Sequence, residues 1–104
     1  MGYVGPGTVK QLRATYPDAE LIGFDIGYFA NHLTNTSILP EVWLNEQIIG
    51  DVRQFPAKYL EGIDAIVYLA AISNDPMGSV YQEITMDVNY RSAVRIAGLA
   101  RAAG

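Results

Sequence analysis

The sequence has no cysteine and a single histidine among its 104 residues. This composition excludes a disulfide framework and a thiolate metal site, and it offers almost no imidazole to a metal ion. The chain has no apolar run near the roughly 20 residues that cross a bilayer, and its N-terminus lacks the basic and then apolar layout of a signal peptide. We therefore expect no metal site, no membrane segment and a cytoplasmic location.

Basic residues are also scarce. Seven Lys and Arg stand against eleven Asp and Glu, for a net charge of −4 at pH 7. We do not expect a nucleic acid partner, because binding to a phosphate backbone needs Lys and Arg gathered on one face. What the chain does have is 50% hydrophobic and 17% charged residues, which is typical of a compact folded domain. We predict one small domain over residues 1–104.

Hydrophobic periodicity predicts helices that alternate with short apolar strands. The clearest strand ends in a pair of alanines, and the last helix carries an apolar stripe along its length. The expected elements are a helix over 5–16, a strand over 20–25, an irregular loop with one short helical turn over 26–45, a strand over 47–50, a weak helix over 56–60, a strand over 63–69 and a helix over 82–103. Such alternation predicts an α/β fold with a parallel sheet.

A glycine-containing turn opens the first predicted helix. Gly2-Tyr3-Val4-Gly5 matches what remains of a Thr-Gly-x-x-Gly-x-x-Gly phosphate-binding turn that is cut just after its first glycine. Such a turn needs glycine because the backbone bends tightly and approaches a pyrophosphate, while free N–H groups at the helix start face the anion. Gly2 would be the close-approach residue and Gly5 the packing residue. A plain N-terminal turn is the alternative.

An acidic residue follows at the spacing that a dinucleotide-binding fold uses. Asp25 ends the predicted strand 20–25 and lies 20 residues after Gly5, about where such folds bind the adenosine ribose. A carboxylate accepts hydrogen bonds from both ribose hydroxyls and repels a 2′-phosphate. Residues 14–52 contain no Lys or Arg to bind that phosphate. We therefore predict NAD as the cofactor rather than NADP, with a capping or turn aspartate as the alternative role.

Five short motifs occur along the chain in the same order as in a known family of enzymes. They are Gly2-Tyr3-Val4-Gly5, Phe24-Asp25, Gly50-Asp51-Val52-Arg53, Tyr68-Leu69-Ala70-Ala71 and Asp87-Val88-Asn89. Together they resemble the extended short-chain dehydrogenases/reductases, the NAD-dependent epimerase/dehydratase family. The resemblance covers nearly the whole chain and implies an α/β, Rossmann-type doubly wound parallel sheet. It also implies that the sheet is incomplete, with the first strand and the C-terminal part missing, so residues 1–104 would form a partial NAD-binding Rossmann domain.

The resemblance implies roles for residues in the second half of the chain. Asp51 would bind the adenine amino group and Val52 would contact the ring through its backbone, whereas a solvated loop acid is the alternative for Asp51. Ala70 and Ala71 would pass beneath the diphosphate and the nicotinamide ribose, and they could equally be small residues that pack a strand on a helix. Asn89 would brace the central sheet and the active site, or simply open a helix. The expected cofactor-binding residues are Gly2, Tyr3, Val4, Gly5, Asp25, Asp51, Val52, Ala70, Ala71 and Asn89.

Catalysis in the family uses a tyrosine whose pKa is lowered by a lysine four residues later. The chain has seven tyrosines, and none has a lysine at that position, so we predict no catalytic residue and no turnover by this chain alone. The full-length parent would be an oxidoreductase that acts on a nucleotide sugar. Tyr68 stands where the family usually has histidine, and the segment 73–76 is similar to a less-characterised epimerase-like group, so the subfamily stays open.

Two other functions remain open. One is a non-catalytic dinucleotide-binding sensor or scaffold module; the other is a flavodoxin-like or response-regulator-like domain, which needs paired acids after a first strand that this chain lacks. A missing first strand would also leave the strands that end at Asp25 and Ala71 with unpaired edges. We therefore predict marginal stability, with those strands pairing to each other or the chain associating with another copy of itself.

Overall fold

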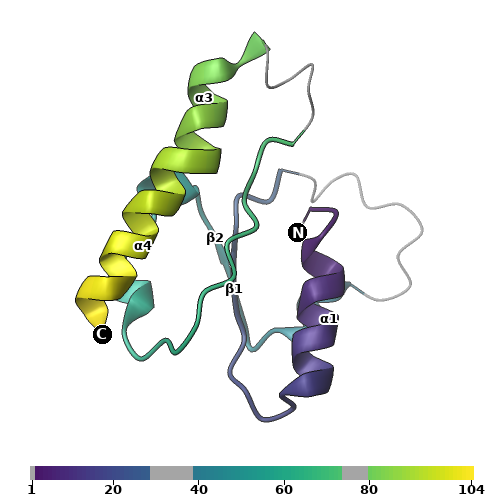
Figure 1. Ribbon diagram of the computed structural model, residues 1–104. Coiled ribbons are helices and arrows are strands. Elements are labelled where there is room, and N and C mark those ends of the chain that lie inside the picture. Colours follow the sequence, from purple (N-terminus) through teal and green to yellow (C-terminus); the bar gives the residue numbers. More distant parts are fainter. Residues whose placement is uncertain (1, 29–38, 74–79) are drawn as a thin grey trace. The chain divides into compact units, whose positions relative to one another are not determined.

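A computed structural model describes residues 2–28, 39–73 and 80–104 (Figure 1). The chain divides into two compact units, Met1–Gly50 and Asp51–Gly104, which are called unit 1 and unit 2 below. The predicted loop 26–45 falls partly on residues 29–38, and the segment 73–76 falls partly on residues 74–79; both of these ranges lie outside the described residues.

Unit 1 begins with the predicted helix. Helix α1 spans Gly5–Thr15, and a proline stands in its first turn, where the missing N–H costs no hydrogen bond. The helix ends at Thr15 and is capped by Tyr16, whose N–H donates to the carbonyl of Leu12 at 2.8 Å. Pro17 follows, and the residue before a proline is disfavoured in the helical conformation. The predicted helix over 5–16 is therefore confirmed to within one residue.

The two strands found among the described residues of unit 1 pair in parallel. Strand β1 spans Ile22–Asp25 and strand β2 spans Glu46–Ile49, with the short 3-10 helix η1 at Pro40–Trp43 before β2. The register runs from Ile22 opposite Glu46 to Asp25 opposite Ile49. The predicted strands at 20–25 and 47–50 are thus confirmed with ends that differ by one or two residues.

A hydrogen-bond network fastens one end of unit 1. The guanidinium of Arg13, in the last turn of α1, donates to Oδ1 of Asn45 at 2.6 Å. It also donates to the backbone carbonyls of Ala19, Pro17 and Trp43 at 2.7, 2.9 and 3.1 Å. Asn45 in turn accepts from the N–H of Leu21 at 2.9 Å. These bonds tie the C-terminal end of α1 to the residues just before β1 and β2.

The described part of unit 2 contains two 3-10 helices and one long helix. Helix η2 spans Val52–Gln54 and η3 spans Ala57–Leu60. The long helix consists of α3 at Gln82–Met86, the π-helical turn η4 at Asp87–Arg91 and α4 at Ser92–Ala103. The predicted helix over 82–103 is confirmed, and the weak helix predicted at 56–60 forms as the 3-10 helix η3.

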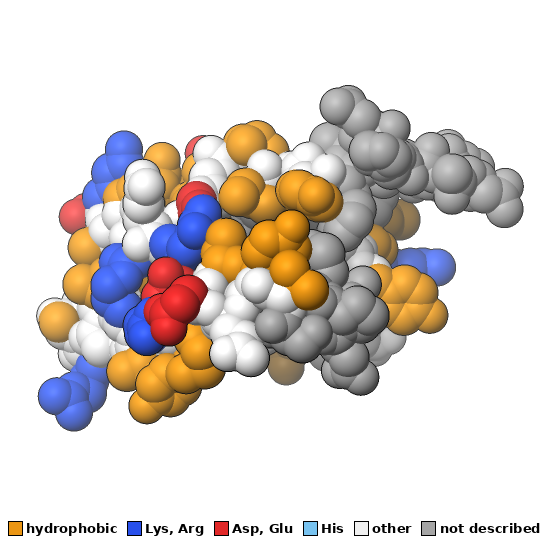
Figure 2. All heavy atoms as spheres, turned by 90° about the horizontal axis from the view of Figure 1, so that it is seen from above, with side chains coloured by type: hydrophobic (Ala, Val, Ile, Leu, Met, Phe, Trp, Pro, Cys, Tyr) orange, Lys and Arg blue, Asp and Glu red, His pale blue; other side chains and the backbone are white. Residues whose placement is uncertain are grey.

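Burial is sparse in the described chain. Leu60 on η3 and Ile96 on α4 are buried against solvent together with Ser92. Large apolar side chains are exposed in both units, and hydrophobic side chains are visible between charged ones on the face in Figure 2. Among the described residues, no helix is both long and apolar enough to cross a membrane.

The predicted third strand does not form. Residues 63–73 are described and carry no strand, and the sheet found among the described residues has two strands, β1 and β2. A strand requires a neighbour that accepts and donates its backbone hydrogen bonds, and 63–69 has none in the described chain. The predicted Rossmann-type doubly wound parallel sheet is therefore wrong. The structure instead combines helices with a two-stranded parallel sheet.

Candidate functional site

The start of α1 is open to solvent. Val4 precedes the helix without a side-chain cap, and the first turn contains no acidic residue. Tyr3 is fully exposed, Val4 is 59% exposed, and a Cβ placed on Gly2 would meet no described atom within 4 Å. The described fold therefore does not itself require glycine at position 2. The first N–H groups of a helix lack partners within it and favour negative charge nearby.

Asp25 lies at the carboxyl end of β1, as predicted. Its carbonyl accepts from the N–H of Gly50 at 3.0 Å, which extends the β1–β2 pairing by one bond. Its Oδ1 accepts from the N–H of Gly27 at 2.6 Å, and Gly27 has φ of +72°, which favours glycine. Asp25 thus forms the turn that was its alternative role, and this turn orients its half-buried carboxylate.

Unit 1 brings the glycine turn and Asp25 to the same end. Residues 16–21 connect α1 to β1, and the Arg13 network holds the end of the helix at the beginning of the strands. The helix and the strand therefore run in opposite directions (Figure 1). As a result, the residues that precede α1 and the carboxyl ends of β1 and β2 share the other end of unit 1.

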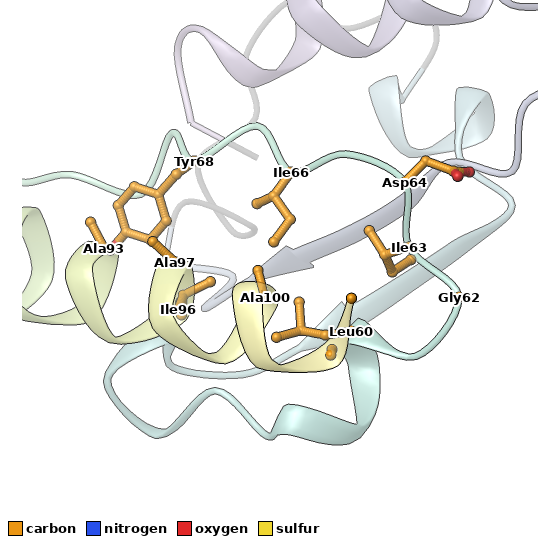
Figure 3. Close-up of a pocket in the computed structure, with 12 residues that line it drawn as sticks. Leu60, Gly62, Ile63, Asp64, Ile66, Tyr68, Ala93, Ile96, Ala97 and Ala100 are labelled. Atoms are coloured by element: carbon orange, nitrogen blue, oxygen red, sulfur yellow. The ribbon is translucent and has the colours of Figure 1, made fainter.

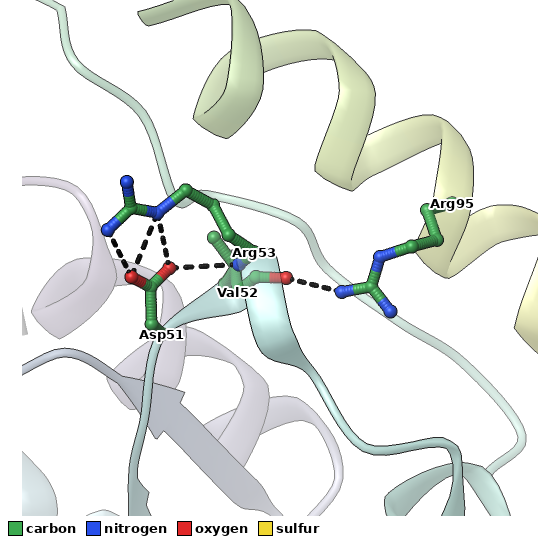
Figure 4. Close-up of polar contacts among 4 residues, drawn as sticks. All are labelled: Asp51, Val52, Arg53 and Arg95. Carbon is green, nitrogen blue, oxygen red and sulfur yellow. Dashed lines mark hydrogen bonds and ion pairs between the residues drawn. The ribbon is translucent and has the colours of Figure 1, made fainter. Parts of the chain in front are cut away.

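In unit 2 the carboxylate of Asp51 is bound by its near neighbour Arg53. Asp51 Oδ1 accepts from the backbone N–H of Arg53 at 2.9 Å and so caps η2, and Arg53 Nε lies 3.0 and 2.9 Å from the two carboxylate oxygens (Figure 4). A terminal guanidinium nitrogen of Arg53 also donates to Oδ2. The side-chain hydrogen bonds from Arg53 lower the pKa of Asp51. An adenine amino group would have to displace one of these bonds, because a carboxylate accepts about four.

Arg95 lies on α4 and binds the backbone of η2. Its guanidinium donates to the carbonyl of Val52 at 2.8 Å (Figure 4). It also donates to the carbonyl of Phe55 at 3.1 Å. The carbonyl of Val52, one of the backbone groups predicted to contact adenine, therefore already accepts a hydrogen bond. Nothing in the sequence pattern pointed to this role for Arg95, because Arg95 and Phe55 are 40 positions apart and no local periodicity spans that distance.

Asn89 contacts the backbone beside Ala70 and Ala71. Its Oδ1 accepts from the N–H of Ile72 at 2.8 Å, and its Nδ2 donates to the carbonyl of Ile72 at 2.9 Å. One residue earlier, the carbonyl of Val88 accepts from the hydroxyl of Tyr68 at 2.5 Å. The turn η4 thus fastens residues 63–73, called the extended segment below, on both sides of Ala70 and Ala71, and Asn89 braces this segment directly.

An open cavity lined mostly by hydrophobic residues lies between residues 60–68 and α4. It has a volume of about 620 Å³ and twelve lining residues, of which the side chains from α4 are mostly alanines (Figure 3). Ile66 and Tyr68 line it from the extended segment, and Ile96 and Ala97 line it from α4. Its one acidic side chain, Asp64, lies at the edge of the view in Figure 3. None of the ten predicted cofactor-binding residues lines this cavity.

No protein-family model, curated protein or solved structure matches this chain.

The predicted site residues divide evenly between the two units. Unit 1 holds Gly2, Tyr3, Val4, Gly5 and Asp25, and unit 2 holds Asp51, Val52, Ala70, Ala71 and Asn89. Within unit 1 the glycine turn and the acid share one end of the strands. Within unit 2, hydrogen bonds engage Asp51, Val52 and Asn89 with the protein itself. No group of three or more His, Asp or Glu in the described part of the chain is placed to hold a metal ion.

Proposed function

We propose that this chain binds NAD and is the cofactor-binding portion of an oxidoreductase of the sugar-nucleotide epimerase or dehydratase type. The observation that carries the proposal is the placement of Asp25, which lies at the carboxyl end of a parallel strand and is oriented by the N–H of Gly27. In open parallel sheets, ligands bind outside the carboxyl ends of the strands. In the full-length parent the second partner would be a nucleotide sugar.

The chemistry of Asp25 suits a ribose with two free hydroxyls. A carboxylate accepts about four hydrogen bonds, so the bond from Gly27 is compatible with two more from a ribose. Its charge repels a 2′-phosphate, and no Lys or Arg occurs between Arg13 and Arg53 to offset that repulsion. These features favour NAD over NADP.

The start of α1 supports the same proposal. It shares the Asp25 end of unit 1, its first turn has no acidic residue, and its cap has no side-chain hydrogen bond. A diphosphate placed there would meet backbone N–H donors and the positive end of the helix dipole. Gly2 has open space where a side chain would stand, so a ligand could approach its backbone closely.

A titration of the whole chain with NAD and with NADP, followed by calorimetry, tests the proposal. We expect NAD to bind more tightly than NADP, and Asp25→Ala to weaken NAD by roughly 10-fold or more because a charge-assisted hydrogen bond contributes about 1.5–3 kcal/mol. Asp25→Asn retains an oxygen that accepts from Gly27 but removes the charge and replaces the second acceptor oxygen by an NH2 donor, so it should lose the preference for NAD.

Asp18 provides the matched control. It is an exposed aspartate in the turn that follows α1, at the fastened end of unit 1, so Asp18→Ala should leave both affinities unchanged. Equal affinity of the unmodified chain for NAD and NADP would refute the cofactor assignment. Equal losses in the Asp18 and Asp25 variants would refute the role of Asp25.

A second candidate function is a non-catalytic dinucleotide-binding module. The observation that favours it is the absence of a lysine four residues after any of the seven tyrosines, since that pair performs the proton transfer in the family. The complete gene separates the two functions. A Ser or Thr followed by Tyr-x-x-x-Lys outside residues 1–104 would establish an enzyme, and its absence from the gene would establish a binding module.

A further inference from the structure

Ile49 lies directly beside Asp25 at the carboxyl ends of the two strands of unit 1. The register of the parallel pair sets Asp25 opposite Ile49, and the N–H of Gly50 extends this pairing through its 3.0 Å bond to the carbonyl of Asp25. Aligned residues on neighbouring strands project to the same face of a sheet, about 4.8 Å apart. The carboxylate of Asp25 and the aliphatic side chain of Ile49 are therefore neighbours on one face.

The two faces of the sheet differ at this end. Phe24 projects to the face opposite Asp25, because successive side chains of a strand alternate, and a Cβ placed on Gly50 would collide with its ring. On the Asp25 face, Ile49 reaches over the turn that orients the carboxylate, since its Cδ1 and Cγ2 lie 3.8 and 3.9 Å from a Cβ placed on Gly27. The side chain of Ile49 is 68% exposed. A ligand bound to Asp25 therefore meets an aliphatic surface on the same face.

The covalent structure of a nucleotide determines which of its parts meets Ile49. The base is attached to C1′ of the ribose, next to the C2′ whose hydroxyl would bind Asp25, whereas the phosphate is attached through C5′ at the other end of the sugar. With the ribose on Asp25, the base lies within about one strand spacing of the carboxylate, which is the distance to Ile49. The flat face of a base gains free energy when it covers an exposed aliphatic side chain.

The polar groups that the sequence assigns to the base are already engaged within unit 2. The carboxylate of Asp51 accepts four hydrogen bonds from Arg53, two at each oxygen, which is about its full capacity. The carbonyl of Val52 accepts from Arg95. The side chain of Ile49 has no donor or acceptor of its own. Recognition of the base by apolar contact needs none of these bonds to break.

We infer that Ile49 binds the base of the nucleotide by apolar contact and that the site does not recognise the 6-amino group of adenine. This inference rests on the proposed binding of NAD at Asp25 and adds how the base is held. Selectivity then resides in the ribose, through the carboxylate of Asp25, and not in the polar edge of the purine. Hypoxanthine, which carries an oxygen in place of the 6-amino group, should be bound as well as adenine.

Calorimetry of the unmodified chain with NAD and with nicotinamide hypoxanthine dinucleotide tests the inference. The two dinucleotides share both riboses, the diphosphate and the nicotinamide, so a difference in affinity reports the base alone. We expect their dissociation constants to agree within about twofold. A carboxylate that accepts from the amino group would instead favour NAD by roughly 10-fold or more, which is the contribution of a hydrogen bond to a charged group.

Two alanine variants test the part that Ile49 plays. Ile49→Ala should weaken both dinucleotides by the same factor, about fourfold or more, because the loss of one buried CH2 group corresponds to about fourfold in affinity. Ile49→Val keeps a branched side chain and should restore most of the affinity. Ile22→Ala is the matched control, since Ile22 is an exposed isoleucine that lies opposite Glu46, at the other end of the same strand pair. It should leave both affinities unchanged.

The outcomes separate this inference from the proposed function. Failure of the unmodified chain to bind NAD would remove the proposed function and the inference together. Binding of NAD with clearly weaker binding of the hypoxanthine analogue would overturn the inference alone, and so would equal affinities in the Ile49→Ala and Ile22→Ala variants. Equal binding of the two dinucleotides, with a loss confined to Ile49→Ala, would support it.

Discussion

The hydroxyl of Tyr68 donates a hydrogen bond to the backbone carbonyl of Val88, with 2.5 Å between the two oxygens. Val88 lies in the π-helical turn η4, and such a turn removes carbonyls from the regular i→i−4 ladder of an α-helix. The next residue, Asn89, binds both backbone groups of Ile72. One helical turn therefore holds the extended segment at two points.

Replacing Tyr68 by Phe should loosen both points. The lost hydrogen bond contributes about 1 kcal/mol to stability. Without the hydroxyl of Tyr68, the carbonyl of Val88 is free to accept a regular α-helical hydrogen bond, and this change would rotate Asn89 away from Ile72. We expect faster hydrogen exchange at the Ile72 amide, measured by NMR, together with a lower free energy of unfolding. Tyr90→Phe, an exposed tyrosine of the same turn, is the control. Unchanged exchange at Ile72 in Tyr68→Phe would contradict the coupling.

Tyr68 also makes the stability of the fold depend on pH at high pH. Burial raises the pKa of Tyr68, Arg95 lowers it in part, and Asp51 adds to the increase. A raised folded pKa means that this contribution to stability is complete below the unfolded value of about 10 and is lost as pH rises through the folded pKa. Tyr68→Phe should therefore lose less stability above about pH 10 than the unmodified chain, measured by denaturant unfolding.

Arg13 should be the most sensitive surface residue of unit 1. Its guanidinium serves four acceptors, including the carbonyl of Trp43 and Oδ1 of Asn45. Arg13→Ala should lower the free energy of unfolding by at least about 2 kcal/mol, and Arg13→Lys should recover little because a single ammonium cannot reproduce the planar fork. The fluorescence of Trp43, the one tryptophan of the chain, reports the transition. Lys10→Ala on the exposed side of the same helix is the control; an equal effect there would count against the network.

Gly27 and Gly62 form a matched pair of substitutions. Their φ angles are +72° and +73°, and an added Cβ would meet only ordinary contacts with Ile49 at Gly27 and nothing within 4 Å at Gly62. Each change to alanine should cost about 1–2 kcal/mol of stability through the backbone alone. Only Gly27→Ala should also weaken NAD, because the N–H of Gly27 orients Asp25. Calorimetry that finds equal NAD affinity in the two variants would contradict this role of Gly27.

Four of the elements that were predicted correctly have local causes. The helices at 5–16 and 82–103 follow from apolar spacing and from the stop at Tyr16-Pro17, and the strands at 20–25 and 47–50 are short apolar runs that end in Asp25 and Gly50. The strand predicted at 63–69 is wrong although its composition was the clearest of all. Composition measures how well a segment suits a sheet, whereas the sheet itself also needs a neighbouring strand.

The candidate site likewise has some features that the sequence predicted and others that only the structure shows. The position of Asp25 at the end of a strand followed from the sequence, and the structure added the Gly27 turn that orients its carboxylate. Arg53, which binds the carboxylate of Asp51, is only two residues away from it in the sequence. The Gly50-Asp51-Val52-Arg53 motif could therefore have indicated this interaction. The contacts of Arg13 with Trp43 and Asn45 join residues 30 and 32 positions apart, and those of Arg95 with Phe55 and Val52 join residues 40 and 43 positions apart. No local sequence pattern contains these contacts.

The sequence by itself determined the helices, the two short strands and the acid at the end of the first of them, because their hydrogen bonds or their apolar periodicity arise within a few residues. Only the tertiary structure decided which strands pair, which arginines bind backbone carbonyls and how η4 holds the segment beside Ala70 and Ala71. A helix satisfies its backbone from residues four positions away, but an extended segment depends on a partner from elsewhere. For residues 64–71 the described chain supplies none.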